Sequence, residues 1–192
     1  MVPNHLFQLL SLVAMEPPSR FDAHSVRSDK AEALAAIQTQ TEQEALRNSV
    51  RAQYRAGRVG DRDVVDYRAT KDVAPTSVTE TYVALKLAID NWRWAGVPFF
   101  LRTGKGLADK MSEITLKFKK VPFNVFRGSD MDLPMRDHLT VRVQPNEGIT
   151  IGFNVKQPGP GMHLGRAAMD FDYDEAFAHT EISDAYELLL LE

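Results

Sequence analysis

The chain has 192 residues, of which 44% are hydrophobic and 26% are charged, as in an ordinary soluble globular protein. Its formal net charge of −3 argues against a protein that mainly binds nucleic acid or an anionic membrane, because both tasks need a net basic face. The absence of cysteine excludes disulfides, thiolate catalysis and cysteine-based metal sites. We therefore expect a protein that has no nucleic-acid partner.

The opening residues, MVPNHLFQLLSLVAMEPP, predict a short amphipathic helix with Asn4 and His5 just ahead of it. The helical spacing is carried by Leu6, Leu9, Leu10 and Val13. Pro17 and Pro18 end the helix. The apolar run is too short to span a bilayer and lacks the basic start of a secretory signal, so we expect a cytoplasmic protein without a membrane partner.

Further along, a second helix is expected to start at Ser25 as N-cap and to run through residues 29–38. Residues 56–75 are polar and glycine-containing and predict a long surface loop. Apolar and polar residues then alternate, which predicts strands in segments 82–89, 98–104 (a short buried strand), 112–121 and 168–173, a hairpin over 138–155 and a terminal helix from 183. This order indicates an α+β fold with helices on one face of a large, mostly antiparallel sheet.

His5 is the first candidate functional residue. An imidazole can take up a proton near neutral pH, so His5 could act as a general base. The alternative is an exposed polar residue near a chain end.

The second candidate is the segment RTGKGLADK, residues 102–110. Arg102, Lys105 and Lys110 lie around a turn that Gly104 would allow, and together they could hold a phosphate through charge-assisted hydrogen bonds. A solvated basic loop would have the same composition.

The third candidate is the polar side of the strand TVRVQ, where Thr140, Arg142 and Gln144 alternate with apolar residues and project from one face. Such a face could line a ligand cleft, although the water side of a sheet looks the same. The remaining histidines show no spacing typical of a metal site.

Four stretches taken together resemble glucose-6-phosphate dehydrogenase along essentially the whole chain. They are NHLFQLLSLVAMEPP, RAQY (51–54), VALKLAIDNWRWAGVPFFLRTGK (83–105) and VRVQPNE (141–147). The resemblance implies that His5 is the catalytic base, taking the proton of the C1 hydroxyl as hydride leaves for NADP⁺. It also implies that Lys105, Lys110 and Gln144 contact glucose 6-phosphate, and that the enzyme serves the pentose phosphate pathway as a homodimer built through the sheet.

Some family members bind a second, structural NADP⁺ through positions that match Arg102 and Arg142, together with a lysine directly after the position that matches Lys110. Met111 stands at that lysine's position, which predicts that this second site is incomplete.

The resemblance places residues 1–192 in an incomplete C-terminal domain, helical over 1–50 and sheet-forming over 80–175, without the domain that binds NADP⁺. It implies that the chain is cut just before His5 and that Met1 matches an internal methionine of the family. We therefore expect the chain alone to be inactive, since no G-x-G-x-x-G loop is present to hold the cofactor. The alternative is a non-catalytic module that dimerises or binds a sugar phosphate weakly.

Overall fold

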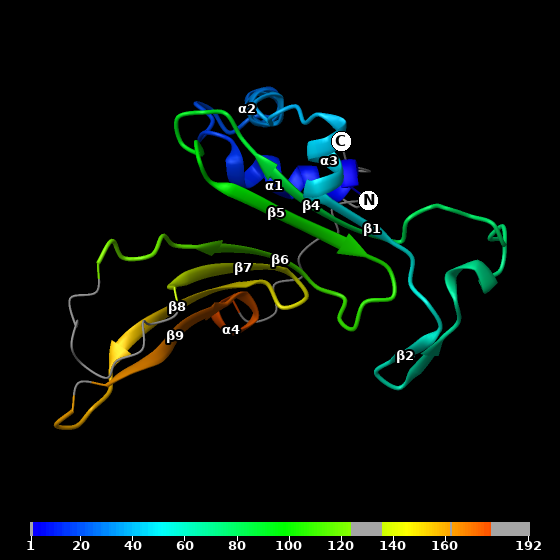
Figure 1. Ribbon diagram of the computed structural model, residues 1–192. Coiled ribbons are helices and arrows are strands. Elements are labelled where there is room, and N and C mark those ends of the chain that lie inside the picture. The colour runs from blue at the N-terminus through cyan, green and yellow to red at the C-terminus, as the bar shows by residue number, and fades with distance from the viewer. Residues whose placement is uncertain (1, 124–135, 162, 178–192) are drawn as a thin grey trace. The chain divides into compact units, whose positions relative to one another are not determined.

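The computed structural model describes residues 2–123, 136–161 and 163–177. The chain forms two compact units, Met1–Ala108 and Asp109–Glu192 (Figure 1). Helices and antiparallel strands make up both units, which confirms the α+β class, and the strands divide among a three-stranded, a two-stranded and a four-stranded sheet. The predicted helix from residue 183 lies outside the described residues.

The first unit begins with the predicted helix. A π-helical turn, η1 (Val2–Leu6), continues directly into α1 (Phe7–Ala14), and α1 ends before Pro17 as expected. Helix α2 (Ala23–Ala35) starts earlier than predicted, because Asp22 rather than Ser25 is the N-cap. The Asp22 carboxylate accepts the Ser25 backbone N–H at 2.9 Å, so Ser25 is the residue that is capped.

Helix α3 (Glu42–Asn48) was not predicted. Thr41 and Glu44 form a capping box in which the Thr41 hydroxyl accepts the Glu44 N–H and the Glu44 carboxylate accepts the Thr41 N–H. The helix leads directly into β1 (Ser49–Ala52), a short strand that the sequence reading also missed.

The central sheet of this unit has the order β1-β4-β5 and is antiparallel throughout. Strands β4 (Tyr82–Ala88) and β5 (Pro98–Gly104) confirm two predicted strands. Strand β5 is not buried on both sides as expected, because Leu101 is buried while the neighbouring Phe100 is 74% exposed. Figure 1 shows α1 and α2 together on one side of this sheet.

The hydrophobic core lies between that face and the helices. Its buried members are Leu10, Ala14, Ala33, Ile89 and Leu101. Residues following α2 extend the sheet beyond β4 through an isolated antiparallel bridge between Ile37 and Ile89. Every second residue of β4 and β5 thus faces the helices. Leu10 and Ala14, which are four residues apart on α1, pack onto this face.

Segment 56–75 is partly ordered secondary structure, which corrects the prediction of a long loop. It contains the hairpin of β2 (Gly57–Val59) and β3 (Arg62–Val64), followed by the 3₁₀ turn η2 (Tyr67–Ala69). Gly60 turns the hairpin with φ +59°, a conformation that glycine adopts without steric cost.

The second unit is a four-stranded antiparallel meander in the order β6-β7-β8-β9. It consists of β6 (Ser112–Lys117), β7 (His138–Gln144), β8 (Gly148–Lys156) and β9 (Leu164–Asp172), followed by the short helix α4 (Tyr173–Phe177). The predicted hairpin is therefore confirmed, and the strand expected over 168–173 begins earlier, at Leu164.

One face of this second sheet is apolar. Its rows follow the register, with Leu116, Leu139, Ile151 and Met169 side by side and Ile114, Val141, Ile149 and Phe171 in the next row. Ile151, Met169 and Phe171 are 38%, 63% and 39% exposed, and within the described ranges no apolar residue of this unit is fully buried. Three of the eight side chains on this face are thus exposed, and the other five are half-buried.

No helix among the described residues is long and apolar enough to cross a membrane.

Candidate active site

His5 lies in η1, inside a continuous helical segment rather than ahead of one. Leu6 has helical dihedrals of φ −64° and ψ −45°, so the π-helical turn passes into α1 without a break. The side chain of His5 is exposed and makes no hydrogen bond or ion pair with any residue that the structure describes. Single π-helical turns are frequent at functional sites, and this one leaves the imidazole available to a ligand.

Lys105 follows β5 directly, and main-chain contacts fix its position. Its backbone N–H donates to the carbonyl of Thr81 at 2.8 Å, and its side chain projects into solvent. The sequence assigned the turn to Gly104, whereas the glycine with positive φ in this turn is Gly106, at +65°. Gly104 is required for close approach, since a Cβ there would lie 2.9 Å from Cδ2 of Tyr82.

The helical turn that carries His5 contacts the strand that ends just before Lys105. η1 touches β5, and Leu6 packs against the buried cluster that includes Leu101. Arg102 stands on the opposite face of β5 from Leu101, exposed and paired in register with Ala84.

Lys110 and Gln144 belong to the second unit, so the predicted site residues divide between the two units. Lys110 is exposed in the segment before β6. Gln144 ends β7, and its amide nitrogen donates to the Ser112 hydroxyl at 3.1 Å. Its amide oxygen has no hydrogen-bond donor in the described ranges and could accept one from a ligand hydroxyl.

Arg142 lies on the polar face of the second sheet, for which the sequence allowed either the lining of a ligand cleft or a solvated surface. The guanidinium is instead held inside the sheet: it donates to Thr150 at 2.6 Å and forms ion pairs with Asp170 at 3.5 Å and Asp172 at 3.7 Å. The Thr115 and Thr140 hydroxyls lie 3.1 Å apart on the same polar face. This face is thus a network of satisfied polar groups, and an anion at Arg142 would have to compete with two carboxylates.

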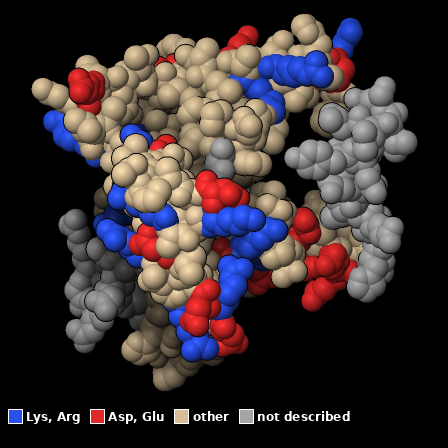
Figure 2. Space-filling model, turned by 90° about the vertical axis from the view of Figure 1, so that its right-hand side faces the viewer, with Lys and Arg blue, Asp and Glu red and all other residues tan. Residues whose placement is uncertain are grey.

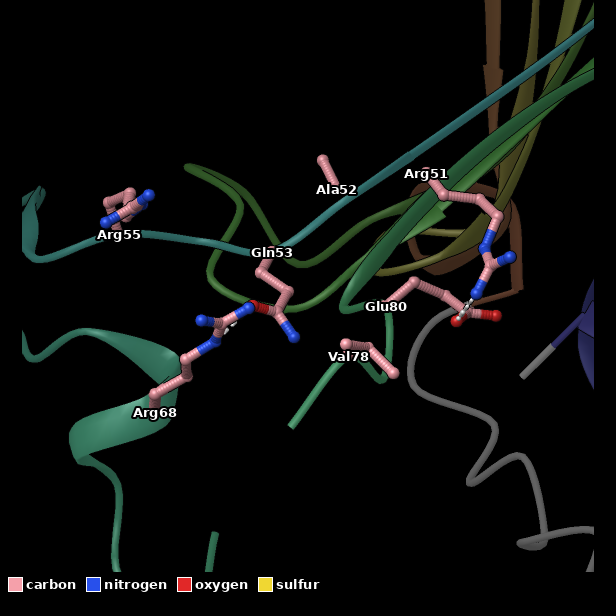
Figure 3. Close-up of a pocket in the computed structure, with 7 residues that line it drawn as sticks. All are labelled: Arg51, Ala52, Gln53, Arg55, Arg68, Val78 and Glu80. Atoms are coloured by element: carbon pink, nitrogen blue, oxygen red, sulfur yellow. Dashed lines mark hydrogen bonds and ion pairs between the residues drawn. The ribbon is translucent and has the colours of Figure 1, made fainter. Parts of the chain in front are cut away.

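A pocket of about 360 Å³ lies elsewhere, between the end of β1 and the segment before β4 (Figure 3). None of the predicted site residues lines it. Arg51 donates to Glu80 at 2.8 Å and Arg68 donates to Gln53 at 3.1 Å, whereas Arg55 lies apart from both pairs. Hydrogen bonds from its own backbone N–H and from Arg51 lower the pKa of Glu80.

Two of the three arginines that line this pocket are paired with carboxylates, Arg51 with Glu80 and Arg55 with Asp66 at 3.7 Å. On the face drawn in Figure 2, basic and acidic side chains lie next to one another and do not gather into one basic area. The described residues also contain no cluster of histidine and carboxylate side chains able to hold a metal ion.

Two residues at the Lys105 turn were not recognised in the sequence. Thr81 is only 9% exposed, and its hydroxyl accepts the Tyr54 N–H at 2.9 Å while its carbonyl accepts that of Lys105. Tyr54 belongs to the RAQY motif, which was noticed without being given a role. In the sequence, only the RAQY motif and the glycine at position 106 point to this turn. Neither of them shows by itself that Tyr54 and Gly106 lie in contact.

Comparison with known proteins shows which family this chain belongs to. The sequence profile described as "Glucose-6-phosphate dehydrogenase, C-terminal domain" matches residues 1–192. Among curated relatives, glucose-6-phosphate 1-dehydrogenase of Rhizobium meliloti is 45% identical over 100% of this chain and 39% of its own length. The enzyme of Aggregatibacter actinomycetemcomitans is 43% identical over 100% of the chain and 38% of its own length.

Solved structures give the same result. A glucose-6-phosphate dehydrogenase in complex with its substrate glucose-6-phosphate matches 99% of this chain and 37% of its own, with a TM-score of 0.83 and 33% identity. The enzyme from Mycobacterium avium matches 90% of this chain and 34% of its own, with a TM-score of 0.74 and 35% identity. The chain thus spans less than half the length of these proteins. It belongs to the glucose-6-phosphate dehydrogenase family, and the profile of that family's C-terminal domain matches residues 1–192 of the chain.

Proposed function

We propose that this chain binds glucose 6-phosphate and supplies the general base of a glucose-6-phosphate dehydrogenase, which converts glucose 6-phosphate and NADP⁺ to 6-phosphogluconolactone and NADPH. The observation that carries the proposal is the contact of η1, which bears His5, with β5, which ends at the Lys105 turn. In this proposal Lys105 of the first unit contacts the sugar phosphate, and the same role for Lys110 and Gln144 rests on the family resemblance alone. The protein would act in the cytoplasm, in the pentose phosphate pathway.

The spacing of the two elements supports a shared substrate. Leu101, in the cluster against which Leu6 packs, precedes Lys105 by four residues of extended chain, which is roughly 13 Å at about 3.3 Å per residue. The exposed side chains of His5 and Lys105, which lie on or directly after these two contacting elements, could then reach the two ends of a phosphorylated hexose. Lys105 would then bind the phosphate through charge-assisted hydrogen bonds.

His5 would take the proton of the C1 hydroxyl, a step that must accompany removal of hydride from that carbon. A histidine suits this role because an imidazole can take up a proton near neutral pH. The exposed ring makes no hydrogen bond with the described residues that would have to break before it could approach the hydroxyl.

The described residues do not fit a dinucleotide. All their strand pairs are antiparallel, whereas a dinucleotide-binding half needs parallel strands joined by a helix with a glycine-rich loop at its start. We therefore propose that the chain by itself does not turn over. The check is NADPH absorbance in the presence of glucose 6-phosphate and NADP⁺; sustained turnover that the His5→Asn variant abolishes would refute it.

Substrate binding is tested by calorimetry with glucose 6-phosphate. Lys105→Ala should weaken binding about tenfold, the loss of one charge-assisted hydrogen bond, while Lys71→Ala serves as the control on an exposed lysine of the same unit. Glucose without phosphate should bind both proteins equally weakly. Equal affinity of Lys105→Ala and wild type for glucose 6-phosphate would refute the role of Lys105.

The role of His5 has a separate measurement. If the substrate lies beside the ring, the Cε1 proton resonance of His5 should shift when glucose 6-phosphate is added. His24, which is exposed in the first turn of α2, provides the internal control and should not respond. A shift of neither resonance at saturating ligand would remove His5 from the site.

A second candidate function is dimerisation through the second sheet, with or without catalysis. The exposed part of the apolar rows, where Met169 is 63% exposed, favours a second copy of the sheet as its cover. Met169→Asp should lower the dimer fraction in sedimentation experiments. Ala168→Asp is the matched control, because Ala168 is the adjacent exposed residue on the opposite face of β9. A monomeric wild-type chain, or equal effects of the two changes, would exclude this interface.

A further inference from the structure

The Tyr54 ring forms the surface against which the Lys105 turn rests. A Cβ atom at Gly106 would lie 3.3 Å from Cγ, 3.4 Å from Cδ1 and 3.6 Å from Cβ of Tyr54, so the main chain of Gly106 passes close to the ring where it joins Cβ. Gly106 also has φ +65°, which side-chain-bearing residues rarely adopt. Glycine is therefore needed at position 106 both for its conformation and for the proximity of Tyr54.

Thr81 links this turn to the segment that follows β1. Its backbone N–H donates to the carbonyl of Ala52 at 2.9 Å, and its own carbonyl accepts the Lys105 N–H at 2.8 Å. Its hydroxyl accepts the Tyr54 N–H at 2.9 Å. Because Thr81 is 9% exposed, water is a poor substitute for these bonds, and loss of one would leave a buried polar group unsatisfied.

Tyr54 is itself held in place from the other side. Its ring meets that of Tyr67 edge to face, with centroids 5.7 Å apart, and its carbonyl accepts the Tyr67 N–H at 3.4 Å. The Tyr54 hydroxyl lies 3.4 Å from that of Thr70, a long and weak contact. The ring, rather than the hydroxyl, is therefore the part of Tyr54 that supports the turn.

We propose that Tyr54 and Thr81 are positioning residues for Lys105: they fix the main chain at residues 105–106, so that the lysine side chain starts from one defined place. This inference rests on the proposed role of Lys105 at the sugar phosphate. A lysine ammonium on a flexible stem loses considerable entropy on binding, and a fixed main chain lowers the part of that loss that binding must cover. It also gives the RAQY motif a function that its sequence does not suggest.

A merely structural role would have a different signature. If Tyr54 only contributed to the stability of the unit, its removal would lower the unfolding midpoint without a selective effect at Lys105. If it positions the turn, two local quantities change together: hydrogen exchange of the Lys105 amide and affinity for glucose 6-phosphate. Both are measured on the whole chain, by NMR and by calorimetry.

The first pair of variants is Tyr54→Ala and Tyr54→Phe. Removal of the ring should speed exchange of the Lys105 amide about tenfold or more, since its bond to Thr81 would open locally. The same variant should bind glucose 6-phosphate about fivefold more weakly, because part of the ordering would have to occur during binding. Tyr54→Phe keeps the ring and should match wild type in both measurements.

The second pair is Gly106→Ala and Gly60→Ala. Both glycines have a similar positive φ, +65° and +59°, so both substitutions carry a similar backbone cost. A Cβ at Gly60 meets nothing within 4 Å, whereas one at Gly106 meets the Tyr54 ring. Gly106→Ala should therefore perturb Lys105 exchange and sugar-phosphate affinity, while Gly60→Ala should leave both unchanged. This pair gives an answer even if Tyr54→Ala does not fold.

The outcomes separate this inference from the proposed function. Unchanged Lys105 exchange in folded Tyr54→Ala, or equal effects of Gly106→Ala and Gly60→Ala, would overturn the inference whatever the ligand does. If Lys105→Ala weakens binding but Gly106→Ala does not, the inference fails and the proposed function stands. If the wild-type chain does not bind glucose 6-phosphate, the proposed function fails, and the exchange data alone decide whether Tyr54 holds the turn.

Discussion

Replacement of Ile89 by alanine should be among the most damaging single changes in the first unit. Ile89 is 1% exposed and lies in the buried cluster with Leu10 and Leu101, between the sheet and the helices. The shortened side chain leaves a cavity that the helices and the sheet cannot easily close, because backbone hydrogen bonds hold the residues on either side of Ile89. The Gln38 N–H donates to the Ala88 carbonyl at 2.9 Å, and the Asp90 N–H donates to the Ala36 carbonyl at 2.8 Å. We expect a loss of about 3 kcal/mol in the free energy of unfolding.

Tryptophan fluorescence during urea unfolding measures this loss in the first unit alone. Both tryptophans, Trp92 and Trp94, lie in that unit, and Trp94 reports on the core because its indole N–H donates to the Ala14 carbonyl at 3.0 Å. At a typical slope of about 1.5 kcal/mol per molar urea, the midpoint should fall by about 2 M. Val50→Ala, at a position 58% exposed, is the control and should move the midpoint little. Equal midpoints for the two variants would refute the assignment of the core.

Further changes test the second sheet and the response to acid. Gly148→Ala would place a Cβ 2.4 Å from the Phe171 carbonyl oxygen, so thermal unfolding followed by circular dichroism should show a loss of about 2 kcal/mol. Gly165→Ala meets only the Gln157 side chain, 3.0 Å away, and should cost less; the reverse order would contradict the β8–β9 register. A hydrogen bond from Arg93, and to a smaller extent its charge, lowers the pKa of Glu16. The Glu16–Arg93 pair therefore stabilises the fold above the unfolded pKa of about 4.3, and this stabilisation is lost as pH falls through the lower folded pKa. Arg93→Gln should flatten the decline of the urea midpoint between about pH 5 and pH 3, and an identical decline in both proteins would contradict the pairing.

The sequence was most informative where one face of a strand is apolar. Strict alternation identified β4, β6 and the β7–β8 hairpin, because side chains of period two must lie on opposite faces once a strand pairs. It could not tell how fully each face is covered. Strand β5 was expected to be buried because PFF is apolar, yet Phe100 points away from the helices and is 74% exposed.

The elements that were missed are short and polar. Strands β2 and β3 have three residues each and no buried side chain, so no alternation can be seen in them. Their hairpin depends on the turn at Gly60, a local signal that was weighed as a loop feature. Helix α3 left a clearer trace, since Thr41 and Glu44 have the spacing of a capping box ahead of a helix. That signal needed no tertiary information.

A basic side chain in a sequence does not show whether its charge is available to a ligand. Arg142 and Lys105 each come from a motif shared with the family, and sequence treats them alike. In the folded chain Arg142 is 25% exposed and bound by Asp170 and Asp172, residues that are distant in sequence and reach it only through the β7–β8–β9 register. Lys105 is exposed, with its main chain anchored and its ammonium unpaired among the described residues. Carboxylates that already neutralise a cation must be displaced before a phosphate can bind, whereas a free ammonium on a fixed turn loses only its water and side-chain freedom. This difference favours Lys105 over Arg142 as an anion site, and it arises from strand pairing, which no local pattern around either residue contains.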